Sequence, residues 1–268
     1  MCEILAPAGD KNSALAAINS GADAIYLGLK QFSARSSAEN FDEEQLREII
    51  NYAALFGVKV HVAMNTLVKQ SEAESFIPAV KRAWELGADA IIMQDIFIGR
   101  AIHEMYPEIV LHLSTQAGVC NIYGAKLAKK FGFSRVILAR ETAFEDIRQI
   151  ASFMETEVFV QGALCTCFSG QCYLSSFAGG NSGNRGRCKQ PCRKIYSIDR
   201  KGFEEPAYRI SPSDLSVGQD ILKLIDAGVY SFKIEGRMRR PEYVAAAVGY
   251  YRNIIGGREG DLSALKRT

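Results

Sequence analysis

The pentapeptide GADAI occurs twice in the chain, at residues 21–25 and 87–91. Each copy ends an amphipathic stretch and begins a short apolar run, and the variant AGVYSF at 227–232 lies at the same kind of junction. A glycine that ends a helix directly before a buried strand is typical of the turns in α/β proteins. The two exact copies begin 66 residues apart, which is room for two strand–helix units. The repeat therefore predicts a fold built from recurring βα units.

Outward from this repeat, short apolar runs alternate with amphipathic segments along the whole chain. The apolar runs are rich in Val, Ile and Leu, as buried parallel strands are. They lie at 2–9, 24–29, 59–65, 90–95, 110–116, 135–140, 157–162 and 230–236. The amphipathic segments have acids near their starts or glycines at their ends, as helices do. They lie at 42–57, 74–87, 121–132, 143–154, 218–228 and 241–257.

Eight such strands, each followed by a helix, predict an α/β fold of the (β/α)8 TIM-barrel type, with residues 1–268 as one barrel domain. The alternative is an open doubly wound sheet. That alternative is disfavoured because the turn after the first strand reads APAGDKNS, at 6–13, and contains no GxGxxG motif.

The composition is that of an ordinary soluble protein. The chain has 268 residues, 48% of them hydrophobic and 23% charged, with a formal net charge of +2. This charge gives no overall signal for nucleic acid, so any basic surface must be local. The N-terminus lacks the features of a secretory signal, and no stretch approaches the roughly 18 apolar residues that span a membrane. We therefore expect a cytoplasmic protein whose thiols are reduced, and its oligomeric state is left open.

Five of the seven cysteines lie within the 28 residues from Cys165 to Cys192. Residues 163–217 separate the seventh predicted strand from the seventh helix, and this segment is far longer than an ordinary βα loop. Loops that follow barrel strands lie at the carboxyl-terminal face, where barrel enzymes have their active sites. The sequence therefore predicts a cysteine-rich insertion, 163–217, at that face.

The cysteine spacing is Cys165-x6-Cys172-x15-Cys188-x3-Cys192, with Cys167 inside the first interval. Four thiolates from one loop suit a 4Fe–4S cluster or Zn²⁺. Neither short interval is the CxxC knuckle of a zinc ribbon, yet spacing alone leaves iron–sulfur, zinc and a plain thiol cluster open. Cys167 is interpreted as a small packing residue.

The segment EVFVQGALCTCFSGQCYLS, at 157–175, resembles the signature of peptidase family U32. APAG at 6–9, GNRGRCKQPCR at 183–193 and FKIEGRMR at 232–239 are similar to other segments of that family, so the resemblance covers nearly the whole chain. The family was named for collagenase-like proteases, but its better understood members are hydroxylases that use a cysteine-bound 4Fe–4S cluster.

The resemblance implies one of three hydroxylation targets. These are a wobble uridine of tRNA, giving 5-hydroxyuridine, a cytidine of 23S rRNA, and the ubiquinone ring. For the RNA-modifying members it also implies prephenate as a co-substrate. We therefore expect an RNA hydroxylase, with tRNA or rRNA as its partner and a small anionic metabolite as a second ligand. The basic residues of the insertion and the family favour tRNA.

One departure from the family concerns the cluster ligands. Many relatives read Asp-Leu-Cys where this chain reads Asp214-Leu215-Ser216. If four cysteines hold the cluster, Cys192 then completes a ligand set whose other members are Cys165, Cys172 and Cys188. Otherwise the site has three thiolates, with an open iron or a different ligand. Many relatives also carry a further C-terminal domain, which we expect to be absent because the sequence ends soon after the eighth helix.

Two other functions stay open. A cysteine peptidase needs a thiolate paired with a histidine, and strand alternation places only His61 and His112 inside the barrel. No HExxH or GxSxG motif is present, so a U32-type peptidase is the alternative rather than the first choice. A non-catalytic RNA-binding protein with a structural metal is a further alternative.

Candidate contact residues cluster in the insertion and at strand ends. Residues 184–201 contain seven basic residues and one acid, which favours phosphate or carboxylate binding. Aromatic residues of the insertion, Tyr173, Phe177 and Tyr196, can stack an unpaired base or pack the loop. The predicted substrate-binding residues are Arg185, Arg187, Arg193, Arg237, Asn65 and Gln116.

The catalytic candidates lie on strands. Lys233 and Glu235 share one face of the last strand, where they serve either catalysis or an internal ion pair that orders the barrel. The predicted catalytic residues are Glu235, Lys233, His61 and His112.

Overall fold

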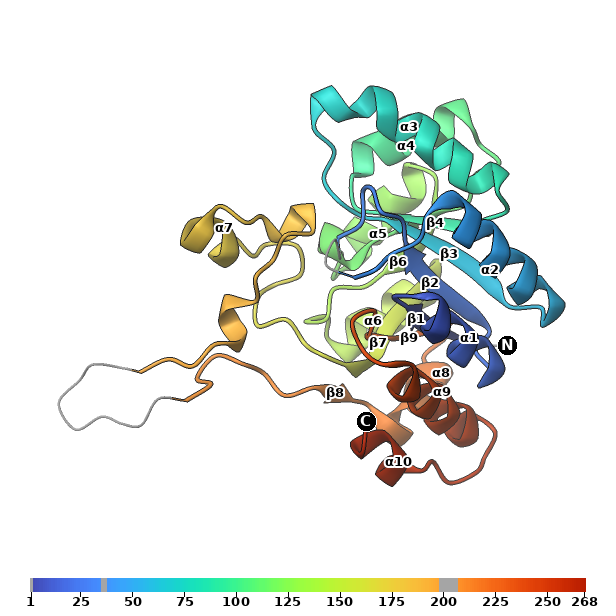
Figure 1. Ribbon diagram of the computed structural model, residues 1–268, viewed down its shortest axis with the longest axis vertical. Helices are drawn as coiled ribbons and strands as arrows, with labels where there is room; N and C mark the ends of the chain where they lie inside the picture. Colours follow the sequence, from blue (N-terminus) through green and yellow to red (C-terminus); the bar gives the residue numbers. More distant parts are fainter. Residues whose placement is uncertain (1, 35–37, 198–206) are drawn as a thin grey trace.

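The computed structural model describes residues 2–34, 38–197 and 207–268, and it confirms the predicted barrel. Parallel strands pair in the order β6-β5-β4-β3-β2-β1-β9-β7, and the pairing of β6 with β7 closes the ring. The short strand β8 pairs antiparallel with the end of β7 and belongs to the insertion. Figure 1 shows the strands at the centre, with the insertion projecting from the end of the barrel opposite the N-terminus.

The strands alternate with helices along the chain. The strands are β1 (Glu3–Ala8), β2 (Ala24–Gly28), β3 (Lys59–Met64), β4 (Ala90–Met93), β5 (Leu111–Leu113), β6 (Phe133–Ile137), β7 (Glu155–Gly162), β8 (Leu215–Ser216) and β9 (Ser231–Ile234). The α-helices are α1 (Lys11–Asn19), α2 (Glu43–Leu55), α3 (Gln70–Glu85), α4 (Ile96–Met105), α5 (Ile122–Lys130), α6 (Phe144–Ala151), α7 (Leu174–Gly179), α8 (Ile221–Asp226), α9 (Pro241–Ile255) and α10 (Leu262–Lys266).

Two barrel helices were not singled out by their sequence pattern. The first, α1, is rich in alanine and has little amphipathic contrast, but the Asp10 side chain caps it by accepting from the Ser13 amide. The second, α4, is capped in the same way by Asp95, which accepts from the Ile98 amide. Asp95 therefore ends the turn after β4 as a helix cap.

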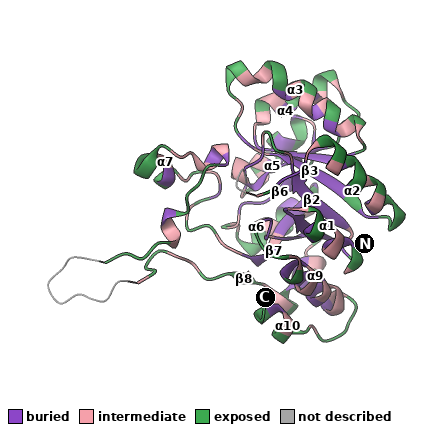
Figure 2. Cartoon of the chain, in the orientation of Figure 1, coloured by how far each residue is buried: buried purple, intermediate pink, exposed green. Residues whose placement is uncertain are grey.

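The hydrophobic core lies mainly between the sheet and the surrounding helices, as the buried strands in Figure 2 indicate. A second, smaller apolar cluster fills part of the barrel interior, and Tyr26 and Ile92 belong to it. Barrel interiors are usually packed with branched apolar side chains. Here one interior layer is instead made of charged residues.

This charged layer joins four strands. Arg135 of β6 donates from Nη1 to Glu3 Oε1 at 2.6 Å and to Glu157 Oε2 at 3.2 Å. Lys233 of β9 donates to Glu157 Oε1 at 2.7 Å, and Ser231 Oγ donates to Glu3 Oε1 at 2.8 Å. All five side chains are buried. The two cations and two carboxylates compensate one another, so the layer is neutral overall, as buried charges must be.

A histidine pair lies at the amino-terminal end of the interior. The rings of His61 and His112 meet edge to face with centroids 4.9 Å apart, and both are almost fully buried. They form the floor of a cavity of about 220 Å³, whose rim carries Lys59, Asp89 and Glu155. Burial, reinforced by the charge of Arg135, lowers the pKa of His61 to about 3 and that of His112 well below 6.5. Both rings are therefore neutral at physiological pH.

The neutral pair should make stability depend on pH. Above pH 6.5 each imidazole is neutral in both the folded and the unfolded chain, so the pair adds no pH dependence. Below 6.5 only the unfolded chain takes up the proton, so stability falls by about 1.4 kcal/mol per pH unit for each histidine. Chemical denaturation at pH 6.5 and 5.0 should show this loss. The slope should shrink in His112→Gln and persist in His103→Gln, whose ring lies half-buried on α4. Equal slopes in both variants would contradict the attribution of this pH dependence to the buried histidine pair.

No helix among the described residues is long and apolar enough to cross a membrane.

Candidate functional site

The mouth of the barrel is ringed by side chains that continue the inward alternation of the strands past their carboxyl ends. Asn65, Gln94 and Glu235 do so after β3, β4 and β9, and Gln116 joins them from the short 3-10 turn Thr115–Ala117 after β5. The side-chain oxygens of Gln94 and Gln116 are buried, and they accept no hydrogen bond from any described residue. Buried polar atoms usually have a partner, so an unsatisfied pair at a barrel mouth indicates a place for water or ligand. The binding role of Gln116 stays a prediction, and Gln94 joins it as a candidate.

Arg140 and Glu235 form an ion pair at the same mouth, beyond the ends of β6 and β9. Arg140 Nη2 donates to Glu235 Oε2 at 3.3 Å, and the guanidinium lies 3.9 Å from the ring centroid of Phe159. Its Nε is buried without a partner in the described part of the chain. Lys233 pairs with Glu157 and not with Glu235, so Glu235 interacts with Arg140 at the mouth.

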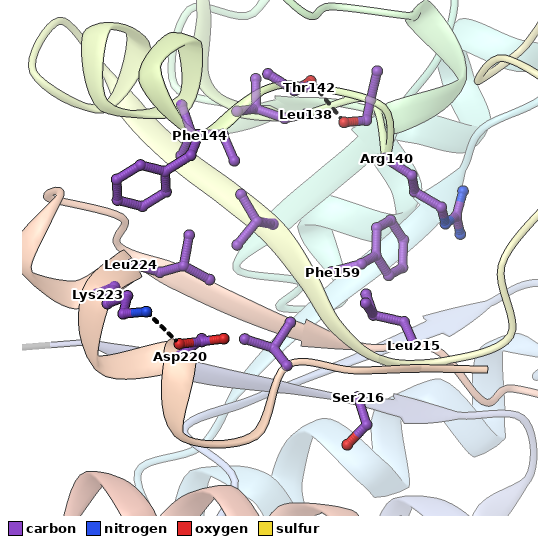
Figure 3. Close-up of a pocket in the computed structure, with 14 residues that line it drawn as sticks. Leu138, Arg140, Thr142, Phe144, Phe159, Leu215, Ser216, Asp220, Lys223 and Leu224 are labelled. Atoms are coloured by element: carbon purple, nitrogen blue, oxygen red, sulfur yellow. Dashed lines mark hydrogen bonds and ion pairs between the residues drawn. The ribbon is translucent and has the colours of Figure 1, made fainter. Parts of the chain in front are cut away.

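A cavity of about 480 Å³ opens beside this pair (Figure 3). Arg140 and Phe159 lie on one side of it, and Phe144 and Leu224 lie on the other, between α6 and α8. Most of the wall is apolar, and its charged groups are Arg140 and the ion pair of Lys223 with Asp220. Such a cavity suits a small molecule with an apolar body and an anionic group.

The insertion is tied to the mouth by contacts with several barrel loops. Ser169 donates two hydrogen bonds to the Glu141 carboxylate, one from its amide and one from its hydroxyl, both at 2.9 Å. Asn184 donates to the Gly170 carbonyl, and the Leu67 amide donates back to the Asn184 carbonyl. The insertion therefore has a fixed seat on the barrel, although Figure 1 shows much of it standing clear of the strands.

Gly170 is part of that seat and should not tolerate a side chain. Its φ is +76°, and an added Cβ would overlap the carbonyl of Gln116. We expect Gly170→Ala to raise local opening of residues 169–186 by about 5- to 150-fold, which corresponds to 1–3 kcal/mol, measured by amide hydrogen exchange. Gly180→Ala is the matched control, since its φ is +69° but nothing lies within 4 Å. Equal effects of the two variants would show that the Gln116 contact is unimportant.

The cysteines of the insertion lie close enough to influence one another. Burial raises the pKa of Cys192, and the thiols of Cys165, Cys188 and Cys172 raise it further against the effect of Arg193. Cys165 and Cys188 are exposed, whereas Cys172 and Cys192 are half-buried. The all-thiol donor set has the chemistry of an iron–sulfur or zinc site. Across residues 2–34, 38–197 and 207–268, however, no three potential ligands are already gathered at metal-binding distance.

Two further positions bear on the ligand set. Burial raises the pKa of Cys167, and a hydrogen bond with Cys172 adds to this, so Cys167 lies beside a predicted ligand. Ser216 is on β8, opposite Gln161 of β7, and hydrogen-bonds with Tyr251. Tyr251 in turn donates to the Val160 carbonyl at 2.7 Å. Ser216 is thus held at the edge of the barrel wall. The fourth cluster ligand expected from the sequence is therefore still Cys192, and this stays a prediction.

The predicted substrate-binding arginines have different surroundings. Arg185 forms an ion pair with Glu72, and Arg193 donates to Ser211 and to the Leu164 carbonyl. Arg237 is buried and donates to Ser33. These three therefore hold loops in place, whereas Arg187 is exposed. Part of the predicted basic stretch, residues 198–201, lies outside the described residues.

The remaining predictions are separated from the cysteines. His61 and His112 lie at the amino-terminal end of the barrel, opposite the insertion, and neither pairs with a thiol in the described chain. Lys233 is buried below the mouth, where burial lowers its pKa although Glu157 opposes this. Asn65 accepts from the Ala34 amide at 3.1 Å, so it positions a loop at the rim. The catalytic roles of these histidines and of Lys233 stay predictions.

The protein is a (β/α)8-barrel protein of a particular class: its barrel is closed, and a thiol-rich loop is anchored at the carboxyl-terminal mouth. The model of peptidase family U32 matches residues 9–261, and the chain belongs to that family.

The chain is also similar to characterised relatives of different names. It is 34% identical to the tRNA hydroxylation protein P1 of Bacillus subtilis, over 94% of this chain and 63% of that protein. It is 37% identical to the 23S rRNA 5-hydroxycytidine synthase of Escherichia coli, over 97% and 41%. It is 36% identical to a collagenase of Porphyromonas gingivalis, over 94% and 65%. The chain thus spans about two thirds or less of the length of each.

Among solved structures, a U32 peptidase shares the fold. The TM-score is 0.60 at 13% sequence identity, and the match covers 88% of this chain and 94% of that one.

Proposed function

We propose that this chain is the barrel of an iron–sulfur-dependent RNA hydroxylase, with the tRNA wobble uridine as the target and 5-hydroxyuridine as the product. The observation that carries the proposal is the seating of the thiol-rich insertion over a mouth with unsatisfied buried polar atoms. The names of the relatives that act on tRNA and rRNA support an RNA substrate. They do not choose between the two RNAs, and the exposed cations of the insertion lead us to favour tRNA.

In this proposal the cysteines of the insertion bind the cofactor and the glutamines of the mouth bind the substrate. Cys165, Cys172, Cys188 and Cys192 hold a 4Fe–4S cluster, which when bound supplies the electron-transfer chemistry of the oxidation. The amide side chains of Gln94 and Gln116 bind the polar edge of the base, because their free oxygens require donors.

The second ligand takes the cavity beside the mouth. Arg140 is oriented by Glu235 and by stacking on Phe159, so it presents a cation to a small anionic metabolite such as prephenate. The apolar walls of the 480 Å³ cavity exclude water from the rest of that ligand.

The proposal is tested by nucleoside analysis. Nucleosides from tRNA and from rRNA of a strain lacking the gene are compared by mass spectrometry with those of the parent strain. Loss of 5-hydroxyuridine from tRNA, restored by the gene but not by its Cys172→Ala form, is the expected result. Loss of a hydroxylated cytidine from rRNA would show that the substrate is rRNA and not tRNA. Unchanged nucleosides in both pools would contradict an RNA hydroxylase.

The collagenase relative keeps a U32-type peptidase as the second candidate. A peptidase that used these thiols would lose gelatin cleavage in Cys165→Ala and Cys172→Ala. Cleavage by the purified chain that is absent from both variants would favour the peptidase. RNA binding without RNA modification, in a protein that needs its metal only for folding, would instead favour a non-catalytic RNA-binding protein.

A further inference from the structure

We propose that the outer face of α7 and the irregular segments on either side of it bind an unpaired segment of RNA by stacking its bases. The surface consists of Phe168, Tyr173 and Phe177, called here the aromatic ridge, together with the exposed cations Arg187 and Lys189. This inference rests on the proposed RNA function and assigns the substrate contact to a surface outside the barrel mouth.

The rings of the aromatic ridge face solvent, whereas a serine of the same helix is buried. Tyr173 and Phe177 are four residues apart, so they lie on the same side of the helical turn. Phe177 is 90% exposed, Phe168 70% and Tyr173 54%. Ser175 lies on the other side, where it is buried and its Oγ accepts from the Lys189 amide at 3.0 Å. The helix thus turns its polar residue inward and its rings to solvent, which marks a contact surface.

The charge around the ridge has one sign. Residues 163–197 contain five cations and no acid. Arg185 and Arg193 are used within the fold, as described above, which leaves Arg187, Lys189 and Lys194 exposed. Exposed rings and exposed cations within one acid-free segment are the features that single-stranded nucleic acid requires, since the rings stack bases and the cations contact phosphates.

The ridge is also held rigidly and close to the thiols. An added Cβ at Gly186 would lie 2.5 Å from the Ser33 carbonyl, so the segment that carries Arg187 is pressed against the loop after β2. The ion pair between Arg185 and Glu72 fixes the same segment to α3. Tyr173 directly follows Cys172, and Lys189 directly follows Cys188. RNA stacked on the ridge would therefore lie beside the predicted cluster ligands.

A protein partner is the less suitable occupant. Protein–protein interfaces are depleted in lysine and in charge at their centres, whereas here exposed cations belong to the same acid-free segment as the rings. We therefore assign the surface to RNA, and binding of a protein becomes one outcome of the test.

The test is fluorescence anisotropy of the whole chain with a labelled RNA stem-loop that has an unpaired loop, and with a fully paired duplex of the same length. We expect Phe177→Ala to weaken stem-loop binding about 10-fold and Tyr173→Ala/Phe177→Ala to weaken it further. Arg187→Ala/Lys189→Ala should weaken binding and reduce its salt dependence. The matched controls are Tyr123→Ala and Lys126→Ala on α5, where the ring is 79% exposed; both should bind like the unchanged chain. Because all of these side chains are exposed, their melting temperatures should agree within about 2 °C.

Three results would overturn the inference. They are ridge variants that bind the stem-loop normally, equal binding of stem-loop and duplex, and gelatin binding that is lost in the ridge variants while RNA binding is kept. Nucleoside analysis separates this inference from the proposed function. If ridge variants lose stem-loop binding while the deletion strain keeps all its hydroxylated nucleosides, the proposed function fails and the ridge assignment holds.

Discussion

Arg135→Met should lower the free energy of unfolding by about 3–5 kcal/mol, the usual cost of removing one partner from a buried ion pair. The guanidinium contacts Glu3 and Glu157 inside the barrel, where water does not compensate their charges. Although burial opposes it, these two carboxylates raise the pKa of Arg135, which shows how strongly the site favours the cation. Methionine fills a similar volume but leaves Glu3 without a counter-ion. Urea denaturation at pH 7 measures the loss.

Two comparisons make this prediction specific. Arg148→Met on α6 removes an exposed arginine whose ion pair with Glu145 is also exposed, so it should change the stability by less than about 0.5 kcal/mol. The double variant Glu3→Gln/Arg135→Met should recover part of the loss, because it removes the stranded carboxylate and leaves the pair of Lys233 with Glu157 intact. A double variant no more stable than Arg135→Met alone would show that packing, not charge, is responsible.

Cys172→Ala should abolish the visible absorbance of anaerobically purified protein and lower RNA hydroxylation by at least about 100-fold. Loss of even an outer-shell partner of a metal site costs about 10- to 100-fold, and a cluster ligand is more directly involved. Iron and sulfide analysis should show the same loss independently of activity. Cys188→Ala and Cys192→Ala should behave alike, because the thiols influence one another in the same loop.

The control for the cysteine variants is Cys120→Ser. Cys120 is half-buried beside α5, outside the insertion, so its variant should keep both absorbance and activity. Protein with one zinc per chain and no absorbance near 400 nm would exclude the iron–sulfur proposal. A Cys192→Ala variant with full iron content would instead show that another group, with Cys167 the nearest thiol to Cys172, completes the ligand set.

The fold was predictable because its signals are local. Short apolar runs and helix-ending glycines recur along the chain, and burial on both sides of a strand leaves this pattern in the sequence. The two helices without a strong pattern, α1 and α4, were missed because they owe their start to the caps Asp10 and Asp95 and their stability to packing on the sheet.

The site was only partly predictable. Strand alternation placed Lys233 and Glu235 on one face of the last strand, and the same alternation applied to β4 would have selected Gln94. The partners of charged residues followed no such rule. Arg185, Arg193 and Arg237 were interpreted as substrate contacts from their sign alone, yet each holds a loop, because their partners come from distant segments such as Glu72 and Ser33.

By itself, the sequence determined the barrel, the position of its long insertion, and the family to which the chain belongs. These depend on periodicity and on motifs that neighbouring residues carry. Only the tertiary structure decided that Lys233 pairs with Glu157, that the histidines lie at the end of the barrel away from the thiols, and that Phe177 faces solvent. Closing the barrel brings together side chains that lie far apart in the chain, such as Glu3 and Ser231, which are 228 residues apart, and no local pattern records which of them will meet.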